Sequence, residues 1–338
     1  MADKEKSPLA VIGAGSWGTA LAILLAHNKN HVRIWGHLQE HMQALCDTKR
    51  NEDFLPGIDF PETLQPCMEL QQTVQGVNDI LIVVPSHAFG SVLKQVKPFL
   101  NEHSRIAWAT KGLEDGTAKL LHENAEEILG NNIPFAVVSG PTFAREVAIG
   151  LPTAITIASK NKAFAGDLAA DMCNSSFRAY TSNDITGVEL GGAVKNVLAI
   201  AAGIADGLGF GANTRAALIT RGLAEIMRLG ICMGGKAETF MGLTGMGDLV
   251  LTCTDNQSRN RRFGIALAKG MSQQQARESI GQVVEGIQTS REVRRLAERM
   301  QVDMPITEQV YRVLYEDVNP KDAVQALFAR DIKAEFEN

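Results

Sequence analysis

Residues 9–26 read LAVIGAGSWGTALAILLA, and this stretch decides the first part of the fold. An apolar run leads into G-x-G-x-x-G at Gly13, Gly15 and Gly18, which opens a helix-like segment. In that context the first glycine permits a tight turn, the second lets the backbone approach a diphosphate, and the third lets helix and strand pack closely. The helix N-terminus then offers free N–H groups to the phosphates. The stretch predicts a dinucleotide-binding turn; a strand-to-helix turn without a ligand is the alternative.

Short β-rich runs recur through the first half of the chain. They lie at residues 9–12, 31–35, 80–84, 105–110, 135–138, 154–158 and 177–181. Most are continuously apolar, as expected for parallel strands covered on both faces. Helix-length segments such as residues 17–27 and 88–96 separate the early runs. This βαβ alternation predicts an α/β fold, a Rossmann domain with a doubly wound, mostly parallel sheet.

The pattern changes near residue 187, after which no β-rich run appears. Helical periodicity continues at residues 188–205, 215–233, 259–269, 285–300, 307–316 and 321–329. Asn319-Pro320 is a favourable start for the last of these helices. We therefore expect residues 1–187 to form the NAD(P)-binding Rossmann domain and residues 188–338 an all-α substrate and catalytic domain.

Composition restricts the class of protein. The chain has 338 residues, 45% hydrophobic and 21% charged, which is typical of globular domains and sufficient for about two of them. The net charge of −5 argues against a general nucleic-acid-binding surface. The five cysteines are scattered and form no C-x-x-C pair, so we expect no disulfide framework, no metal site and a reducing cytoplasmic location.

Targeting segments are not evident in the sequence. Residues 1–8 are charged and lack the apolar core of a secretory signal. The longest apolar run, residues 197–205, is cut by Asp206 and is well short of the roughly 18 residues that a bilayer requires. We therefore expect no membrane span.

The choice of cofactor depends on the end of the second strand. An NAD site usually places an acidic residue about 20 residues after the glycine motif. Here Trp35 is followed by Gly36 and His37, and Glu40 comes too late. We expect His37 to meet a 2′-phosphate, which favours NADPH; a solvated loop histidine is the alternative.

Lysines are the candidate proton-transfer groups of the second half, because all seven histidines lie before residue 123. Lys195 lies within VELGGAVKNVLAI, residues 188–200. Burial among such small and apolar residues would lower the lysine pKa and make proton transfer possible near neutrality. A lysine that reaches the surface along a polar stripe explains the pattern equally well.

Two segments follow strand ends in the first half. Lys111 comes directly after residues 105–110, and SGPTFA, residues 139–144, follows residues 135–138. Ligands of open α/β sheets bind at the carboxyl ends of the strands. Both segments are therefore candidates for the crevice, and plain loops are the alternative.

Anion chemistry is concentrated at residues 258–262, SRNRR. Hydroxyl, amide and guanidinium groups at a helix start suit a phosphate dianion, and a solvated basic helix face is the alternative. Asp248 follows a glycine-rich turn. It either orients a lysine or accepts a substrate hydroxyl, or it caps a helix.

These residues together resemble the bacterial NAD(P)-dependent glycerol-3-phosphate dehydrogenase family over nearly the whole chain. The matching segments are GAGSWGTA at 13–20, VVPSH at 83–87, ATKGL at 109–113, SGPTFA at 139–144, GGAVKNV at 191–197, GMGDL at 245–249, NQSRNR at 256–261 and VVEG at 283–286. The resemblance implies reversible hydride transfer from NAD(P)H to dihydroxyacetone phosphate, giving sn-glycerol 3-phosphate for glycerophospholipid synthesis. It also implies a helical domain like that of 6-phosphogluconate dehydrogenases. We expect a homodimer, because helical domains of this size often pair.

The resemblance also assigns roles. Lys195 matches the proton-transferring residue, beside Asn196, with Asp248 and Thr252 as polar groups around it. The positions matching substrate contacts are Lys111, Gly140, Thr142, Lys195, Asp248, Ser258, Arg259 and Asn260. Those matching cofactor contacts are Gly13, Gly15, Ser16, Trp17, Gly18, His37, Lys111, Ala144, Arg259, Val283 and Glu285. Val283 and Glu285 enter only through the resemblance.

Three other functions remain compatible with parts of the pattern. A hydroxyacid dehydrogenase of the same architecture would bind a carboxylate, which arginine also holds. A catalytically silent redox sensor would bind the cofactor without needing converging lysines. A glycine-rich methyltransferase would leave Gly18 and the helical half unexplained. All the assignments require Lys195 and Arg259 to lie near the glycine turn.

Overall fold

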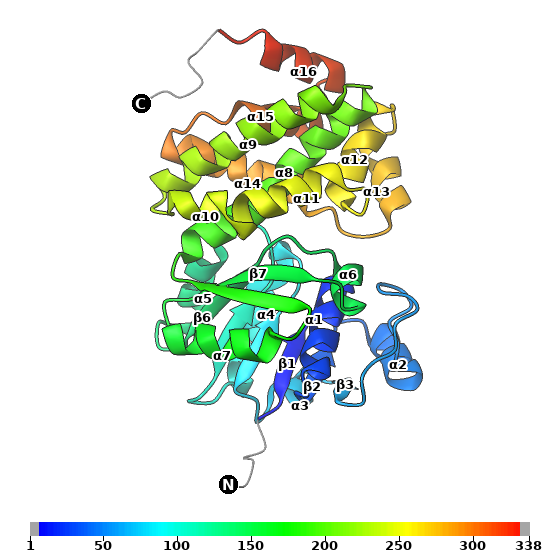
Figure 1. Ribbon diagram of the computed structural model, residues 1–338, viewed down its shortest axis with the longest axis vertical. Coiled ribbons are helices and arrows are strands. Elements are labelled where there is room, and N and C mark those ends of the chain that lie inside the picture. Colours follow the sequence, from blue (N-terminus) through cyan, green and yellow to red (C-terminus); the bar gives the residue numbers. More distant parts are fainter. Residues whose placement is uncertain (1–6, 332–338) are drawn as a thin grey trace.

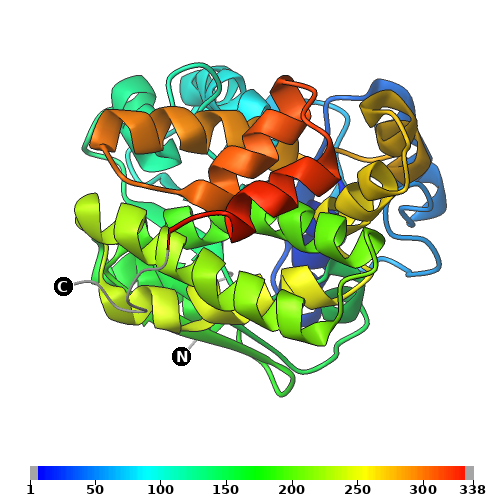
Figure 2. The same cartoon turned by 90° about the horizontal axis from the view of Figure 1, so that it is seen from above.

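The computed structural model describes residues 7–331, which form two stacked layers, a sheet domain and a helical domain (Figure 1). Seen from above, the helices spread over the sheet domain (Figure 2). Residues 1–6 and 332–338 lie outside the described residues. The prediction that the N-terminal segment is not a secretory signal concerns residues 1–8 and therefore falls mostly on residues that are not described.

The sheet has eight strands in the order β3-β2-β1-β4-β5-β6-β7-β8. They are β1 (Leu9–Ile12), β2 (Val32–Trp35), β3 (Leu64–Pro66), β4 (Asp79–Ile82), β5 (Arg105–Trp108), β6 (Phe135–Ser139), β7 (Thr153–Ala158) and β8 (Phe177–Ser182). Every neighbouring pair is parallel except β6 and β7. The predicted doubly wound, mostly parallel sheet is confirmed.

Helices cover both faces of this sheet. They are α1 (Ser16–His27), α2 (Gln39–Thr48), α3 (Leu70–Val74), α4 (Ser86–Val96), η1 (Lys97–Phe99), α5 (Leu121–Leu129), α6 (Ala144–Ala148) and α7 (Lys162–Met172). One core lies between the sheet and α1, α2 and α7, and another between the sheet and α4 and α5. β1 is buried at all four positions, which explains why the central strand reads as continuously apolar.

The described part of the second domain contains helices joined by loops, and no strand. It contains α8 (Ile185–Gly207), α9 (Ala212–Cys232), α10 (Ala237–Met241), η2 (Leu243–Gly247, a π-helical turn), α11 (Asp248–Thr254), α12 (Arg259–Ala268), α13 (Gln273–Ile280), α14 (Glu285–Met300), α15 (Pro305–Tyr315) and α16 (Pro320–Phe328). Asp184 caps α8 by accepting from Gly187 N at 2.9 Å, so this helix begins just before the expected boundary. The predicted all-α second half is confirmed; the boundary at residue 187 stays a prediction.

The central helix α8 is long and apolar enough, by length and composition, to cross a bilayer. All of its apolar window is nevertheless buried inside the protein, with a mean hydropathy of 1.5. Its burial between other helices accounts for the composition, because a helix that is apolar on every side belongs either to a packed core or to a membrane.

Glycines allow α12 to pack directly against α8. A Cβ on Gly203 would lie 2.0 Å from the carbonyl oxygen of Arg261, and one on Gly264 would lie 2.2 Å from that of Ile200. Such contacts are possible only without side chains. The two glycines therefore set the distance between the helix that carries Lys195 and the helix that carries Arg259.

The loop after β5 connects the two domains. Leu113, Ala118 and Leu120 are buried in the core of the helical domain, although they follow a strand of the sheet. Arg299 of α14 donates from Nη2 to the carbonyl of Ala118 at 3.3 Å. This anchoring fixes the segment that begins with Lys111 against the helices.

Replacing Gly203 by alanine is expected to lower the free energy of unfolding by about 1–3 kcal/mol, because the added methyl group meets backbone that cannot move away. Gly166 on α7 is the matched control, since a Cβ there would meet nothing within 4 Å. Gly166→Ala should stabilise by about 0.5–1 kcal/mol. Denaturant unfolding measures both variants, and equal effects would contradict the close packing of α8 and α12.

Candidate active site

The glycine turn has the geometry that its three glycines imply. Gly13 has a φ of +122°, and a Cβ there would lie 2.1 Å from Val83 O. A Cβ on Gly18 would lie 1.8 Å from Gly13 O, whereas one on Gly15 would meet nothing within 4 Å. Gly15 is also the N-cap of α1 and contributes no side-chain cap. The open space at a helix N-terminus fits the diphosphate of a dinucleotide.

Two lysines from different domains share one buried carboxylate. Lys195 Nζ of α8 donates to Asp248 Oδ1 at 2.5 Å, and Lys111 Nζ from the β5 end donates to Asp248 Oδ2 at 2.7 Å. Asp248 has 0% exposed side chain, Lys195 7% and Lys111 16%. Of the two alternatives for Lys195, burial with partners is therefore correct. Asp248 contacts both lysines, which agrees with the interpretation of Asp248 as a residue that orients a lysine.

Thr252 completes this arrangement. Its Oγ1 donates to the carbonyl of Asp248 at 2.6 Å and accepts from Lys195 Nζ at 2.8 Å. Burial lowers the Lys195 pKa to about 8, with Asp248 opposing the shift and the positive charge of Lys111 adding to it. Lys195 can therefore exchange a proton near neutral pH.

Two asparagine side chains connect α8, the helix of Lys195, with α12 and α14. Asn260 Nδ2 donates to Asn196 Oδ1 at 2.9 Å, and Asn260 Oδ1 accepts from Gly286 N at 2.9 Å. Asn196 and Asn260 are the immediate neighbours of Lys195 and Arg259. The helices that carry Lys195 and Arg259 are therefore bonded to each other at the residues next to these two side chains.

Gln282 connects Arg259 with the glycine turn. Its Oε1 accepts from Arg259 Nη1 at 3.2 Å and from Ser16 Oγ at 3.4 Å. Glu285 accepts from Ser86 Oγ at 3.3 Å, at the start of α4. Burial raises the pKa of Glu285 to about 7, although Arg259 opposes the shift. Arg259 therefore reaches Ser16 of the glycine turn through one shared acceptor, as the prediction for this residue required.

The basic segment of α12 is only partly available to an anion. Arg261 donates from Nε and Nη2 to Asp206 Oδ2 at 3.0 and 2.6 Å and also bonds Asn256. Arg262 is exposed, and Ser258 caps the helix by accepting from Arg261 N at 3.2 Å. Our inclusion of Arg261 among the anion-binding groups is wrong, because Asp206 already pairs with its guanidinium. Arg259 is the arginine of this segment that faces the turn.

Of the other sequence-predicted positions, Gly140 contacts this centre directly. Gly140 has a φ of +148°, and its carbonyl accepts from Lys111 Nζ at 3.3 Å and from Thr142 Oγ1 at 3.2 Å. Ala144 begins α6. His37 is exposed on the bend after β2, and Val283 is exposed before α14. Trp17 lies at the start of α1 with its indole nitrogen buried and unpaired.

Reasoning from the residues missed Ser86, Gln282 and Glu285. Glu285 came from the resemblance, which also matched the segment containing Ser86. No spacing rule connects Gln282 with residues more than 200 positions away, and only the packing of α14 onto the sheet domain brings them together.

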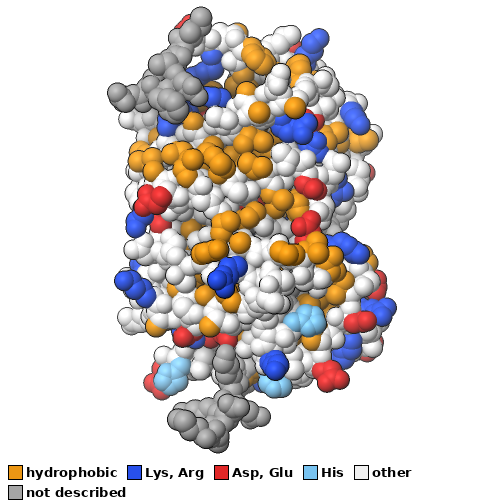
Figure 3. Space-filling view, viewed as in Figure 1, with side chains coloured by type: hydrophobic (Ala, Val, Ile, Leu, Met, Phe, Trp, Pro, Cys, Tyr) orange, Lys and Arg blue, Asp and Glu red, His pale blue; other side chains and the backbone are white. Residues whose placement is uncertain are grey.

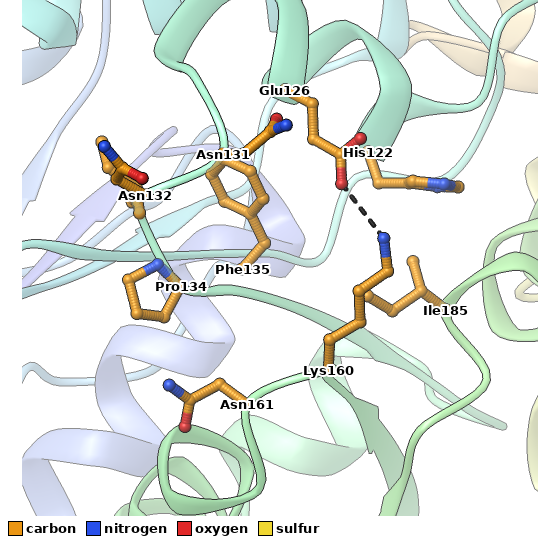
Figure 4. A pocket seen from close by; sticks show the side chains of 10 residues that line it. His122, Glu126, Asn131, Asn132, Pro134, Phe135, Lys160, Asn161 and Ile185 are labelled. Atoms are coloured by element: carbon orange, nitrogen blue, oxygen red, sulfur yellow. Dashed lines mark hydrogen bonds and ion pairs between the residues drawn. The ribbon is translucent and has the colours of Figure 1, made fainter.

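A separate cavity of about 310 Å³ lies away from these residues (Figure 4). Its lining is His122, Glu126, Asn131, Asn132, Ile133, Pro134, Phe135, Lys160, Asn161 and Ile185. Lys160 and Glu126 pair across it at 3.2 Å. None of the residues that we predicted for the site lines this cavity. Across residues 7–331, no group of three His, Cys, Asp or Glu side chains is placed to hold a metal ion.

Two family models match the chain. The model described as NAD-dependent glycerol-3-phosphate dehydrogenase N-terminus matches residues 8–165, and the corresponding C-terminus model matches residues 184–325. Glycerol-3-phosphate dehydrogenase [NAD(P)+] of Vibrio campbellii is 58% identical over 328 residues, 97% of this chain and 95% of that protein. Its namesake in Bartonella quintana is 56% identical over 329 residues, 97% of each chain.

A solved structure is similar in sequence and in fold. The crystal structure of glycerol-3-phosphate dehydrogenase from Coxiella burnetii superposes with a TM-score of 0.94 at 51% identity and covers 96% of this chain and 99% of its own. The Rossmann domain and the helical domain both lie within this match.

Replacing Asp248 by asparagine is expected to lower the Lys195 pKa below about 8, because the amide cannot offset the positive charge of Lys111. NMR titration of the lysine side-chain signals measures the shift. Asp255→Asn, an acidic residue at the other end of α11, serves as the control. An unchanged Lys195 pKa in Asp248→Asn would contradict the shared carboxylate.

Proposed function

Because the chain belongs to the NAD-dependent glycerol-3-phosphate dehydrogenase family, we propose that it reduces dihydroxyacetone phosphate with NAD(P)H to sn-glycerol 3-phosphate, reversibly. The observation that supports this most directly is the pair of lysines on Asp248 beside a cluster that joins Arg259 to the glycine turn. A proton source, an anion-binding group and a dinucleotide site then meet in one place.

Each residue of the site has a definite task in this proposal. Arg259, with Ser258 and Asn260 at the start of α12, holds the substrate phosphate, so that binding energy at the phosphate fixes the carbonyl near Lys195. Thr142 and the Gly140 backbone also contact the substrate.

Proton transfer centres on Lys195. Its ammonium donates a proton from Nζ to the developing alkoxide, and in the reverse direction the neutral amine accepts the proton from the hydroxyl. Asp248 and Thr252 orient Nζ, and Lys111 adds a second positive charge near the oxygen. The nicotinamide supplies or accepts the hydride when bound. Asn196 acts indirectly, by holding Asn260.

The cofactor site in this proposal surrounds the start of α1. Its residues are Gly13, Gly15, Ser16, Trp17, Gly18, His37, Lys111, Ala144, Arg259, Val283 and Glu285. We favour NADPH because no acidic residue directly follows β2, and His37 is exposed where a 2′-phosphate would lie. The ratio of kcat/KM for NADPH and NADH decides this preference.

The cellular setting is also proposed rather than observed. A cytoplasmic enzyme agrees with five free cysteines among the described residues, and the product would enter glycerophospholipid synthesis. For a homodimer, the support is apolar surface. Figure 3 shows hydrophobic side chains across the middle of one face, and exposed hydrophobics of both domains include Leu151, Tyr180, Met241 and Val250.

Lys195→Met is expected to lower kcat by about 10²–10⁴ because it removes the proton donor. In the unmodified protein, kcat/KM for ketone reduction should fall as pH rises through about 8, since the reaction needs the ammonium; alcohol oxidation should rise over the same range. Stopped-flow pH profiles measure both directions. Lys162→Met, an exposed lysine on α7, is the control. Near-normal turnover in Lys195→Met would exclude it from the chemistry.

Arg259→Met is expected to lower kcat/KM for dihydroxyacetone phosphate by about 10²-fold, since truncating one partner of a buried charged pair costs on the order of 2–5 kcal/mol. Activity with unphosphorylated dihydroxyacetone should change much less. Arg262→Met, its exposed neighbour, is the control. Equal losses of kcat/KM on both substrates in Arg259→Met would refute the assignment of Arg259 to the phosphate. Faster turnover of a 2-oxo carboxylate than of dihydroxyacetone phosphate by the unmodified protein would favour a hydroxyacid dehydrogenase.

A further inference from the structure

Asn51 is a buried amide in the connection between α2 and β3, with 0% of its surface exposed. Its Nδ2 donates to Ala14 O at 2.9 Å and to Thr19 Oγ1 at 2.7 Å. Its Oδ1 accepts from Phe54 N at 3.2 Å and lies 3.0 Å from His41 Nε2. Both ends of the amide are thus occupied, and one end is attached to the glycine turn.

The bond to Ala14 acts on the part of the turn that a dinucleotide would approach. Ala14 stands between the first two glycines of the motif, and the described chain contains no cis peptide bond. In a trans peptide the C=O and the next N–H point in opposite directions. Because Asn51 holds the Ala14 carbonyl toward the protein interior, the Gly15 N–H points away from Asn51.

We propose that Asn51 is a positioning residue for cofactor binding, which holds the Ala14–Gly15 peptide so that its N–H, and not its carbonyl, meets the diphosphate. The inference rests on the proposed placement of the cofactor at the glycine turn. Without Asn51, the Ala14 carbonyl would lose a buried donor, and the flexible turn would sample orientations that present an oxygen to an anion.

Asn30 offers a matched control, because it lies just after the C-terminal end of α1, whereas Asn51 bonds to the turn at the N-terminal end of α1. It is 5% exposed, and its Nδ2 donates to Leu25 O at 3.1 Å and to Asp171 O at 3.4 Å. Asn30 and Asn51 are therefore the same residue type, both buried and both bonded to backbone carbonyls around α1. Only Asn51 contacts the glycine turn.

The experiment compares Asn51→Asp with Asn30→Asp in the full-length protein. A carboxylate keeps the shape of the amide but has no N–H to donate. NADPH dissociation constants come from the fluorescence of bound NADPH, Tm from thermal unfolding, and kcat from assays at saturating NADPH. We expect Asn51→Asp to raise the NADPH dissociation constant about tenfold or more, with kcat within about twofold. Asn30→Asp should lower Tm and leave the dissociation constant unchanged.

A lower Tm for Asn51→Asp with an unchanged dissociation constant would overturn the proposal, because that is the result of a purely structural role. If Asn51→Asp does not fold, Thr19→Val and Thr19→Ser replace it. Thr19→Ser keeps the hydroxyl, which accepts from Asn51 Nδ2 at 2.7 Å and itself donates to Ala14 O at 3.4 Å, and Thr19→Val removes it at nearly constant shape. Weaker NADPH binding in Thr19→Val alone would support the anchoring of the Ala14 carbonyl by Asn51 and Thr19 together, and equal binding in both variants would overturn it.

The variant Gly15→Val tests separately whether the cofactor binds at the glycine turn, which is the premise of the role proposed for Asn51. Gly15 has a φ of −75° and open space around a Cβ, so the variant should fold normally and obstruct only the ligand. Unchanged NADPH binding in Gly15→Val would place the cofactor elsewhere and overturn both proposals. Lost binding in Gly15→Val, together with unchanged binding in Asn51→Asp, would overturn only the role of Asn51.

Discussion

The carboxylate of Asp248 is the interaction on which the site depends. It is fully buried and accepts from a lysine of the sheet domain and a lysine of the helical domain. A buried carboxylate is stable only when cationic partners are held close to it, because without them it is an unpaired charge in a medium of low dielectric constant. The interaction therefore requires the two domains to meet in one fixed arrangement.

Several features of the fold provide that arrangement. The loop after β5 is buried in the helical core, so Lys111 cannot move independently of α11. Close approach of α8 and α12 fixes the distance between Lys195 and Arg259. Gln282 and Glu285 then attach α14 and its preceding loop to the starts of α1 and α4. Each of these hydrogen bonds alone is modest, and together with the packing they hold the two domains against each other.

The fold could be predicted from the sequence in most of its parts because its signals are local. Continuous apolar runs and the glycine motif can each be recognised from a few consecutive residues, and they predicted the parallel sheet and the first helix. β3 was missed because Leu64–Pro66 has only three residues and ends in proline, too short for a pattern. Helices α10, α11 and α13 were missed because segments of five to eight residues show little periodicity.

The sequence by itself determined which side chains are present and where strands, turns and long helices begin, since backbone preferences and apolar periodicity act between near neighbours. Only the tertiary structure decided that Lys195 is buried, that Arg261 pairs with Asp206 rather than facing an anion, and that Gln282 and Asn51 reach the glycine turn. Those outcomes depend on desolvation and on contacts between residues far apart in the chain, and both exist only once the two domains have packed together.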